Sequence, residues 1–471
     1  MRLSTHLANA IAGLRAISTG LSIPLVSWGP YHVGLNIRIL TGEARWDHYA
    51  PRHSPQKRRV LVSAFVPINA QDKSCPDGEV NITYMPAKTL DIFGRQAEAM
   101  GLPSDVFNDL EMKFCRLPNI KSSVRDDYTR QTKFPVVIFS PGRGVSRLMY
   151  SAMARSVASH GYVVITVDHA YDASIIEYPD GTVITGVVGE ANQTVRSQDV
   201  SFIIDRIKDN STTREQLGLT GADRVSVFGH SIGGATAVST VFSDDRIQGV
   251  INLDGDMLGP VVKTGLEKPL FLIGRPHSRE QGPSWNETWN RQRGPGMMLQ
   301  IDGITHQSFL DMPLIVTLRD VPEDSKAKVQ AALGTIDGRR MASLVVQLTV
   351  AILDTGKTPP GSPTIDNDIA NVAKDLGPVV EESGDEGVVT VMYSAGGFIG
   401  SGALEGLSSK ARKDAGMTGG AKKIAFITAG IAPEGYEQGP TEFFDYDLGP
   451  FISFVASVSS YPPGVKRHSV L

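Results

Sequence analysis

The sequence feature that most constrains the fold is a serine set between small residues at 229–233, which read Gly-His-Ser-Ile-Gly. The mainly apolar run 224–228 precedes it, and the small residues at 234–238 follow it. Where a strand turns sharply into a helix, glycines are needed beside the turn because larger side chains would clash with the backbone. The pattern therefore predicts a strand, a strained turn and a helix, with the Ser231 hydroxyl exposed as a nucleophile for acyl transfer.

Two further side chains are needed, because a serine hydroxyl reacts only when a histidine takes its proton and a carboxylate orients that histidine. In an α/β-hydrolase these residues follow the serine in the order Asp or Glu, then His. Asp254 follows the apolar run 249–253, and His306 lies just after the predicted strand 298–301. We therefore predict an α/β-hydrolase fold, with a mostly parallel central sheet flanked by helices. Ser231 is the predicted nucleophile, Asp254 the orienting carboxylate and His306 the base.

Both partners of the serine have alternatives in the sequence. Asp256 competes with Asp254, which is preferred because it lies closer to the end of its strand, and either aspartate could cap a helix instead. His169 precedes the serine, the wrong order for this fold, and His277 would leave the last predicted strand without a catalytic residue. His230 flanks the serine, so we expect its side chain to point away from the catalytic pocket.

The negatively charged oxygen of an acyl-transfer intermediate needs hydrogen-bond donors, which in this fold are two backbone N–H groups. One belongs to the residue after the nucleophile, Ile232. The other is expected in the loop 140–144, Ser-Pro-Gly-Arg-Gly, which follows the predicted strand 134–139. We assign it to Arg143. The alternative is an ordinary strand-to-helix turn with no such role.

Residues 59–353 resemble the plasma-type platelet-activating factor acetylhydrolases, as a fungal-type member of that family. The resemblance rests on the segments 135–144, 159–169, 229–236, 253–257 and 303–311. It implies a calcium-independent serine esterase of lipid catabolism that removes short sn-2 acyl groups from phospholipids such as platelet-activating factor. Carried over by position, it also implies a triad of Ser231, Asp254 and His306, with Arg143 and Ile232 as oxyanion donors.

Two positions in the oxyanion loop depart from the family. Pro141 stands where many members have a histidine, and Arg143 stands where an apolar residue is common. The backbone donor of Arg143 does not depend on its side chain, but a cation near the pocket mouth is expected to change the substrate preference. The alternative functions are a general carboxylesterase or polyester hydrolase of the same fold, and a non-catalytic binding protein with a hydrolase fold.

The composition is that of a soluble globular protein, with 41% hydrophobic and 20% charged residues. The net charge of −4 predicts no nucleic-acid partner. The sequence contains no apolar run long enough to span a membrane, and no metal-ligand cluster, so we expect a small-molecule or lipid ester substrate and no cofactor. Phe93, Ala97 and Met100 share one helix face, for which packing in the core or under a lid is favoured over contact with a lipid surface.

Composition divides the chain into four parts: an N-terminal extension, 1–58, the hydrolase, 59–353, a proline- and glycine-rich linker, 354–363, and a C-terminal part, 364–471. A short apolar segment near the N-terminus resembles a signal peptide, so secretion is favoured over a cytoplasmic location. Cys75 and Cys115 would form a disulfide in a secreted protein, and would otherwise be two buried thiols.

The C-terminal part resembles a truncated second α/β-hydrolase. Residues 387–397 again read as strand, serine turn and helix, with Ser394 at the turn, and 422–428 read as another strand. The strands that should precede this turn are missing from the sequence, and so is a histidine loop, so catalysis by Ser394 is not expected. A dinucleotide site at Gly397–Gly400 is not expected either, because it lacks an early glycine and an acidic residue after the next strand.

Overall fold

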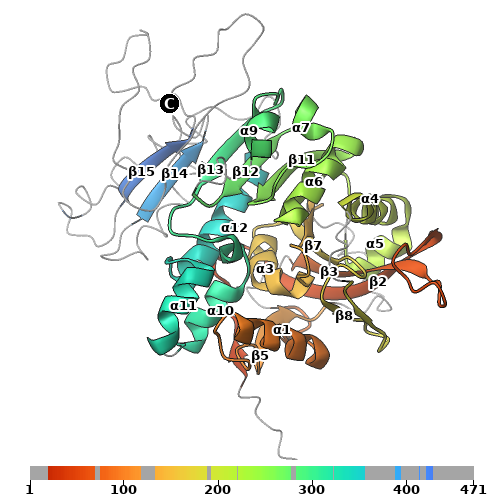
Figure 1. Ribbon diagram of the computed structural model, residues 1–471, viewed down its shortest axis with the longest axis horizontal. Helices are drawn as coiled ribbons and strands as arrows, with labels where there is room; N and C mark the ends of the chain where they lie inside the picture. Colours follow the sequence, from red (N-terminus) through yellow and green to blue (C-terminus); the bar gives the residue numbers. More distant parts are fainter. Residues whose placement is uncertain are drawn as a thin grey trace, which may run out of the picture.

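The computed structural model describes residues 20–68, 75–117, 133–187, 193–219, 221–276, 283–321, 323–355, 388–393, 413 and 421–427. Within these residues, eleven strands form one sheet with helices on both faces (Figure 1). These strands are β1 (Leu21–Ser22), β2 (His32–Trp46), β3 (Lys57–Ile68), β4 (Glu79–Thr83), β5 (Leu110–Cys115), β6 (Val136–Ser140), β7 (Val163–Asp168), β10 (Val225–His230), β11 (Ile247–Leu253), β12 (Leu270–Gly274) and β13 (Gly296–Gln300). A separate hairpin joins β8 (Ile175–Glu177) and β9 (Val183–Thr185).

Most helices lie between strands along the chain, as expected for parallel strands that need crossover connections, and four follow the last strand of the sheet. They are α1 (Ala87–Ala99), η1 (Arg147–Tyr150), α3 (Ser151–Ser159), α4 (Gln193–Asp209), α5 (Ser211–Leu217), α6 (Ile232–Ser243), α7 (Val261–Thr264), α9 (Pro283–Trp289), η2 (His306–Phe309), α10 (Met312–Arg319), α11 (Glu323–Leu333) and α12 (Gly338–Thr355).

The strand order is β1-β5-β2-β3-β7-β6-β10-β11-β12-β13, with β4 paired to β5. From β7 to β13 all neighbours run parallel, whereas β3 runs antiparallel to both β2 and β7. Parallel strands place their carboxyl ends at one edge of the sheet, where ligands bind in folds of this class. This mostly parallel, helix-covered sheet confirms the predicted α/β-hydrolase fold.

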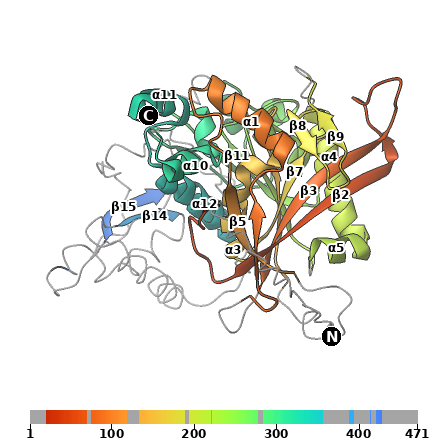
Figure 2. The same ribbon diagram turned by 90° about the horizontal axis from the view of Figure 1, so that it is seen from below.

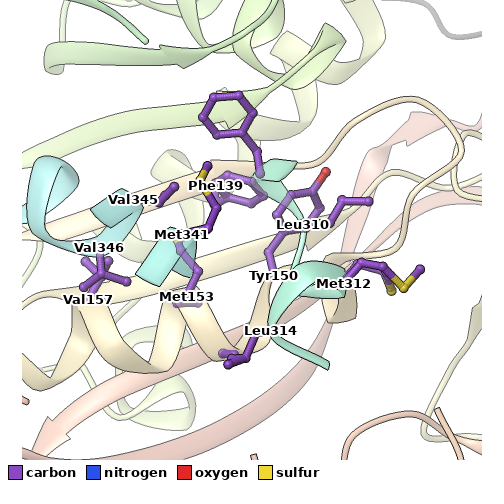
Figure 3. Close-up of a cluster of buried hydrophobic side chains, with 14 of the residues drawn as sticks. Phe139, Tyr150, Met153, Val157, Leu310, Met312, Leu314, Met341, Val345 and Val346 are labelled. Carbon is purple, nitrogen blue, oxygen red and sulfur yellow. The ribbon is translucent and has the colours of Figure 1, made fainter. Parts of the chain in front are cut away.

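The central strands read as continuous apolar runs because their side chains alternate between two buried cores. In β6, Val136 and Ile138 belong to the core formed with α4, α6 and α9, whereas Val137 and Phe139 belong to the core formed with α3, α10 and α12. Figure 3 shows part of the second core, in which side chains from β6 and from these three helices meet.

The predicted apolar stripe on α1 belongs to this second core. Phe93 is 4% exposed and Ala97 is fully buried, and Met100 packs partly buried against the same core. The interpretation as core packing is therefore confirmed, and this stripe is not a surface for lipid. Among the described helices, none combines the length and the apolar character needed to cross a bilayer.

The sheet begins earlier in the chain than the sequence predicted. The strand expected to be first, 59–67, is β3, which pairs with β2 from His32↔Ile68 to Thr41↔Arg59, and Figure 2 shows this long pair. The predicted boundary after residue 58 therefore falls inside β3, and it separates β2 from the strand with which it pairs. The reason is that β2 is largely half-buried and carries polar side chains, so it lacks the continuous apolar run of the central strands.

The structure joins Cys75 and Cys115 in a disulfide, which decides between the two alternatives for these residues. The bond lies beside the antiparallel pair β4–β5, where Glu79 is opposite Cys115. His32 lies close to both sulfur atoms. Sulfur atoms held in a disulfide are not thiolates, which are the form that binds metal ions, so this group is not a metal site.

In the C-terminal part the structure describes β14 (Val388–Tyr393) and β15 (Ala421–Ile427), which form a parallel two-stranded sheet of their own. These strands lie in the two segments predicted to contain them. Ser394, Gly397–Gly400 and the linker from residue 356 onward lie outside the described residues. The interpretation of this part as a truncated second hydrolase stays a prediction.

Candidate active site

The strand β10 leads directly into the predicted nucleophile. Ser231 has φ 58° and ψ −128°, a conformation that costs about 1–3 kcal/mol for a residue with a side chain. Its N–H donates a hydrogen bond to Leu253 O over 2.9 Å, and helix α6 begins at the next residue. A glycine is required at Gly233, because a Cβ there would lie 1.9 Å from Ser140 O. The strained strand-to-helix turn that the sequence predicted is therefore present.

Asp254 and His306 lie at the same edge of the sheet as Ser231. In the register of β10 and β11, His230 is opposite Leu253, so the residues that follow these two strands are neighbours. His306 opens η2, in the loop after β13. Its Nδ1 lies 2.6 Å from Asp254 Oδ2. The fold thus brings together three residues that are far apart in the sequence.

The contact with Asp254 decides which nitrogen of His306 can act as a base. A carboxylate only accepts hydrogen bonds, so Nδ1 carries the proton and Nε2 keeps its lone pair. The backbone N–H of Arg275 also donates to the carboxylate, over 3.2 Å, and its guanidinium lies 3.1 Å from Oδ2. Asp256, the alternative carboxylate, is exposed. The geometry therefore favours Asp254.

Among the described residues, neither Ser231 Oγ nor His306 Nε2 forms a hydrogen bond. His230, which precedes the serine, has its ring centroid 4.6 Å from that of His306, so the end of β10 and the loop of the predicted base are neighbours. The serine–histidine bond of such sites often tightens only when substrate binds. No described residue therefore competes for the Ser231 hydroxyl or for His306 Nε2.

Two buried side chains, those of Arg196 and Tyr150, form hydrogen bonds with the backbone of the loop 140–144. Arg196 of α4, which is 2% exposed, donates to Pro141 O over 2.9 Å and to Gly142 O over 3.3 Å. Gly142 N–H donates to the hydroxyl of Tyr150 over 3.1 Å. Two consecutive carbonyls and one N–H of the loop therefore have defined partners, which fixes the direction of the peptide groups between them.

The two predicted oxyanion donors have no such partners. In the described part of the chain, the N–H groups of Arg143 and Ile232 have no hydrogen-bond acceptor. Ile232 is the first residue of α6, whose N–H groups have no acceptor within the helix. Donors of this kind beside Ser231 are what stabilisation of an oxyanion requires. The geometry is compatible with both assignments.

His169, a rival for the base, makes a different contact. Its Nε2 lies 3.0 Å from Ser140 Oγ, and its Nδ1 lies 2.9 Å from Asp199 Oδ2. The three side chains are at most 1% exposed, so this second Ser-His-Asp group is closed to substrate. Burial lowers the pKa of His169 and keeps its ring neutral. The remaining rival, His277, lies outside the described residues.

The charge of Asp199 is balanced inside the protein. Arg58 Nη2 lies 2.6 Å from its Oδ2, and Arg58 Nη1 also contacts Asp47 over 3.1 Å. Burial alone would raise the pKa of Asp199, but the charge of Arg58 and the hydrogen bonds from Arg58 and His169 hold this pKa well below its usual range. Breaking one partner of such a buried pair typically costs about 3–5 kcal/mol.

This buried support was not predicted from the sequence, although the sequence contains a signal for it. Arg196 and Asp199 lie on the buried face of α4, in helical register with Val200, Ile203 and Ile207. A charged residue at a core position of an apolar stripe needs a partner, because an unpaired buried charge is costly. Only the structure identifies those partners, since they come from other segments of the chain.

Comparison with known proteins places this site in a family. The sequence pattern of the family described as platelet-activating factor acetylhydrolase, isoform II, matches residues 105–182 and 188–359, just over half of the chain. The chain belongs to this family. The matched residues include the elbow at Ser231, the Asp254–His306 pair and the oxyanion loop, so the family's similarity covers the whole site.

Named relatives agree with the family. A probable 1-alkyl-2-acetylglycerophosphocholine esterase of Arthroderma benhamiae is 30% identical over 363 residues, 72% of this chain and 88% of that protein. A platelet-activating factor acetylhydrolase of Bos taurus is 31% identical over 217 residues, 38% of this chain and 48% of that protein. The structure of a ferulic acid esterase from Streptomyces cinnamoneus superposes with a TM-score of 0.55 at 24% identity, over 73% of this chain and 97% of that one, which supports the fold.

Proposed function

We propose that this protein hydrolyses short sn-2 acyl esters of phospholipids, with Ser231 as the nucleophile. Its family makes it a carboxylic ester hydrolase of the platelet-activating factor acetylhydrolase type, acting on a lipid ester. The observation that carries the assignment of residues is the 2.6 Å contact between His306 Nδ1 and Asp254 Oδ2, beside the strained turn of the serine. The preference for short acyl groups at the sn-2 position is a more specific proposal than the ester-hydrolase activity that the family gives.

In the proposed mechanism His306 Nε2 takes the proton of Ser231 Oγ, which attacks the ester carbonyl. The N–H groups of Arg143 and Ile232 donate to the oxygen that becomes negatively charged. His306 then gives its proton to the leaving alcohol, and the acyl group stays on the serine. Water that loses a proton to His306 attacks this acyl-enzyme and releases the acid. Asp254 stabilises the imidazolium through both half-reactions.

The Arg143 side chain supports a charged substrate. It is exposed at the oxyanion loop, so its guanidinium is available near the reacting ester. A guanidinium pairs well with phosphate oxygens, and a phospholipid carries a phosphate next to its sn-2 ester. On this basis we expect Arg143→Leu to raise KM for a phospholipid while leaving KM for an uncharged nitrophenyl ester unchanged.

A fluorophosphonate probe tests the assignment of the nucleophile, because it reacts only with an activated serine. We expect labelling of the wild type and none of Ser231→Ala. Asp254→Asn should label slowly, and Asp256→Asn, which alters the exposed neighbouring carboxylate, should label at the wild-type rate. Equal labelling of Ser231→Ala and the wild type would refute Ser231 as the nucleophile.

A substrate series tests the finer proposal. Phospholipids with acetyl and long-chain sn-2 groups are compared with a simple nitrophenyl ester as kcat/KM. We expect the acetyl phospholipid to exceed the long-chain one by about 100-fold or more, since each added methylene that does not fit costs energy. Similar values for all three would instead identify a general carboxylesterase of this fold.

We also propose that the protein is secreted. The support is the disulfide between Cys75 and Cys115, because disulfides form and persist in oxidising compartments. Expression with the native N-terminus in a secreting host, followed by thiol titration of the denatured protein, tests this. Protein in the medium without free thiols is expected, and retention in the cytosol with two free thiols would contradict the proposal.

A further inference from the structure

A chain of hydrogen bonds connects the oxyanion loop to the loop of His306. Gly142 N–H donates to the hydroxyl of Tyr150 over 3.1 Å, and this hydroxyl lies 2.8 Å from His230 Nδ1. His230 Nε2 in turn lies 2.9 Å from His306 O. The His230 side chain, expected to point away from the pocket, therefore spans the space between the two loops.

The direction of each hydrogen bond follows from the groups at the two ends of this series, the Gly142 N–H and the His306 carbonyl. A backbone N–H can only donate and a backbone carbonyl can only accept. His230 must therefore donate from Nε2 to His306 O. If the ring is neutral, its Nδ1 accepts the proton of the Tyr150 hydroxyl, whose oxygen accepts from Gly142. The arrangement is consistent only with the tautomer of His230 that carries its proton on Nε2.

The surroundings keep both linking side chains neutral. Tyr150 and His230 are at most 1% exposed. Burial, with a smaller effect of the neighbouring His306, lowers the pKa of His230 to about 3. Burial raises the pKa of the Tyr150 hydroxyl. A neutral ring is also what the reaction needs, because a second cation 4.6 Å from the His306 ring centroid would oppose its protonation.

Packing leaves the two side chains little freedom to move. The Tyr150 ring centroid is 4.4 Å from that of Phe139, and Figure 3 shows the Tyr150 side chain among the apolar side chains of the second core. The His230 ring centroid is 5.6 Å from that of Phe309. Because closely packed side chains cannot rotate freely, a movement of one loop would displace Tyr150 and His230 and, through them, the other loop.

We propose that His230 and Tyr150 are positioning residues that couple the oxyanion loop to the loop of the catalytic base through this hydrogen-bond chain. Gly142 precedes the proposed donor at Arg143, and His306 O belongs to the proposed base. The chain of hydrogen bonds therefore sets the separation between the Arg143 N–H and the His306 ring. The inference rests on the proposed function, since this separation matters only if both loops serve one reaction. Neither side chain touches the substrate in this arrangement.

The first test compares His230→Phe, Tyr150→Phe and the double variant in the hydrolysis of a nitrophenyl acetate. Each single change is expected to lower kcat by about 10- to 100-fold with KM changed less than about threefold, because misplaced groups slow the chemical step more than they weaken binding. The double variant should lose no more than about the larger single loss, since either change already breaks the chain. Tyr162→Phe is the matched control: its buried hydroxyl contacts Asp354 instead, and its kcat should equal that of the wild type.

Conservative replacement separates positioning from simple loss of packing. His230→Gln places an amide N–H where Nε2 was and so retains the bond to His306 O. It should recover about tenfold in kcat relative to His230→Phe. Single variants with wild-type kcat, losses that multiply in the double variant, or a glutamine variant no faster than the phenylalanine variant would each overturn the coupling. Ser231→Ala must remain inactive throughout; if it is active, the proposed function itself has failed.

Nitrogen NMR of the wild-type histidines tests the chain without any substitution, and so does not depend on how the variants fold. His230, assigned through its backbone, should show a protonated Nε2, an unprotonated Nδ1 and no titration between about pH 5 and 8. A proton on Nδ1, or titration within this range, would break the required direction of the bonds and refute the proposal.

Discussion

Replacing Gly233 with alanine tests whether the elbow and the oxyanion loop are positioned by direct backbone contact. The new Cβ would lie 1.9 Å from Ser140 O and 2.4 Å from Pro141 O, whereas real Cβ contacts essentially never fall below 3.0 Å. Both obstacles are backbone carbonyls, so no side chain can rotate to make room. Helix α6 and the loop 140–144 must therefore separate by about 1 Å or more.

That separation has two calculable consequences. A displacement of about 1 Å between a nucleophile and its oxyanion donors costs roughly 100-fold in kcat. Forcing an extra methyl into a closely packed position also costs about 1–3 kcal/mol of stability, which a well-folded domain can absorb. We therefore expect a folded Gly233→Ala protein that binds substrate with a similar KM and turns it over about 100 times more slowly.

The assay is steady-state hydrolysis of a nitrophenyl acetate, with thermal unfolding measured on the same preparations. Gly249→Ala in β11 is the matched control, because its Cβ would meet no atom closer than 3.3 Å, a side-chain carbon of Pro269. This control should keep its kcat. A folded Gly233→Ala protein with kcat within about threefold of the wild type would refute the argument, since the loop would then have tolerated the shift.

Three further outcomes are expected. Asp254→Asn should lower kcat by about 10⁴-fold, because the wrong tautomer of the base is then favoured, and a loss equal to that of Asp256→Asn would contradict this. Replacing Cys75 and Cys115 with serine should lower the free energy of unfolding by about 4 kcal/mol, from a sequence separation of 40 residues; an unchanged urea midpoint would contradict this. His230 has a folded pKa of about 3, below its unfolded value near 6.5. The unfolding free energy should therefore fall by up to ~1.4 kcal/mol per pH unit between pH 6.5 and 3 as the unfolded chain binds the proton, and the His230→Gln protein should show a shallower fall.

Local patterns were enough to locate the strands that carry the site. Each of these strands is buried on both faces, so its sequence is a short apolar run, and the predicted catalytic residues follow such runs within five residues. The order Ser231, Asp254, His306 could be read because the topology of this fold connects the strands in sequence order. Likewise the glycine at 233 could be read as a close approach of backbone, which the contact with Ser140 O explains.

Patterns failed where an element is only half-buried. The strand β2 is half-buried at most positions, where polar residues such as Asn36 and Arg38 interrupt the apolar ones. The sequence therefore predicts an extension here, although β2 pairs along much of its length with β3. Its place in the sheet is decided by hydrogen bonds to a partner strand. Such bonds join backbone groups that are the same in every residue, so the sequence contains little record of them.

By itself the sequence determined that a serine would be held at a strained turn between a strand and a helix, with a carboxylate and a histidine after later strands. Those features depend on side-chain size and on the order of residues along the chain. Only the tertiary structure decided that Asp254 rather than Asp256 meets His306, that Arg196 holds the oxyanion loop, and that His230 and Tyr150 connect this loop to His306. Each of these contacts joins segments that are distant in the sequence, and its geometry exists only when the packed sheet and helices have brought the two partners within hydrogen-bond distance.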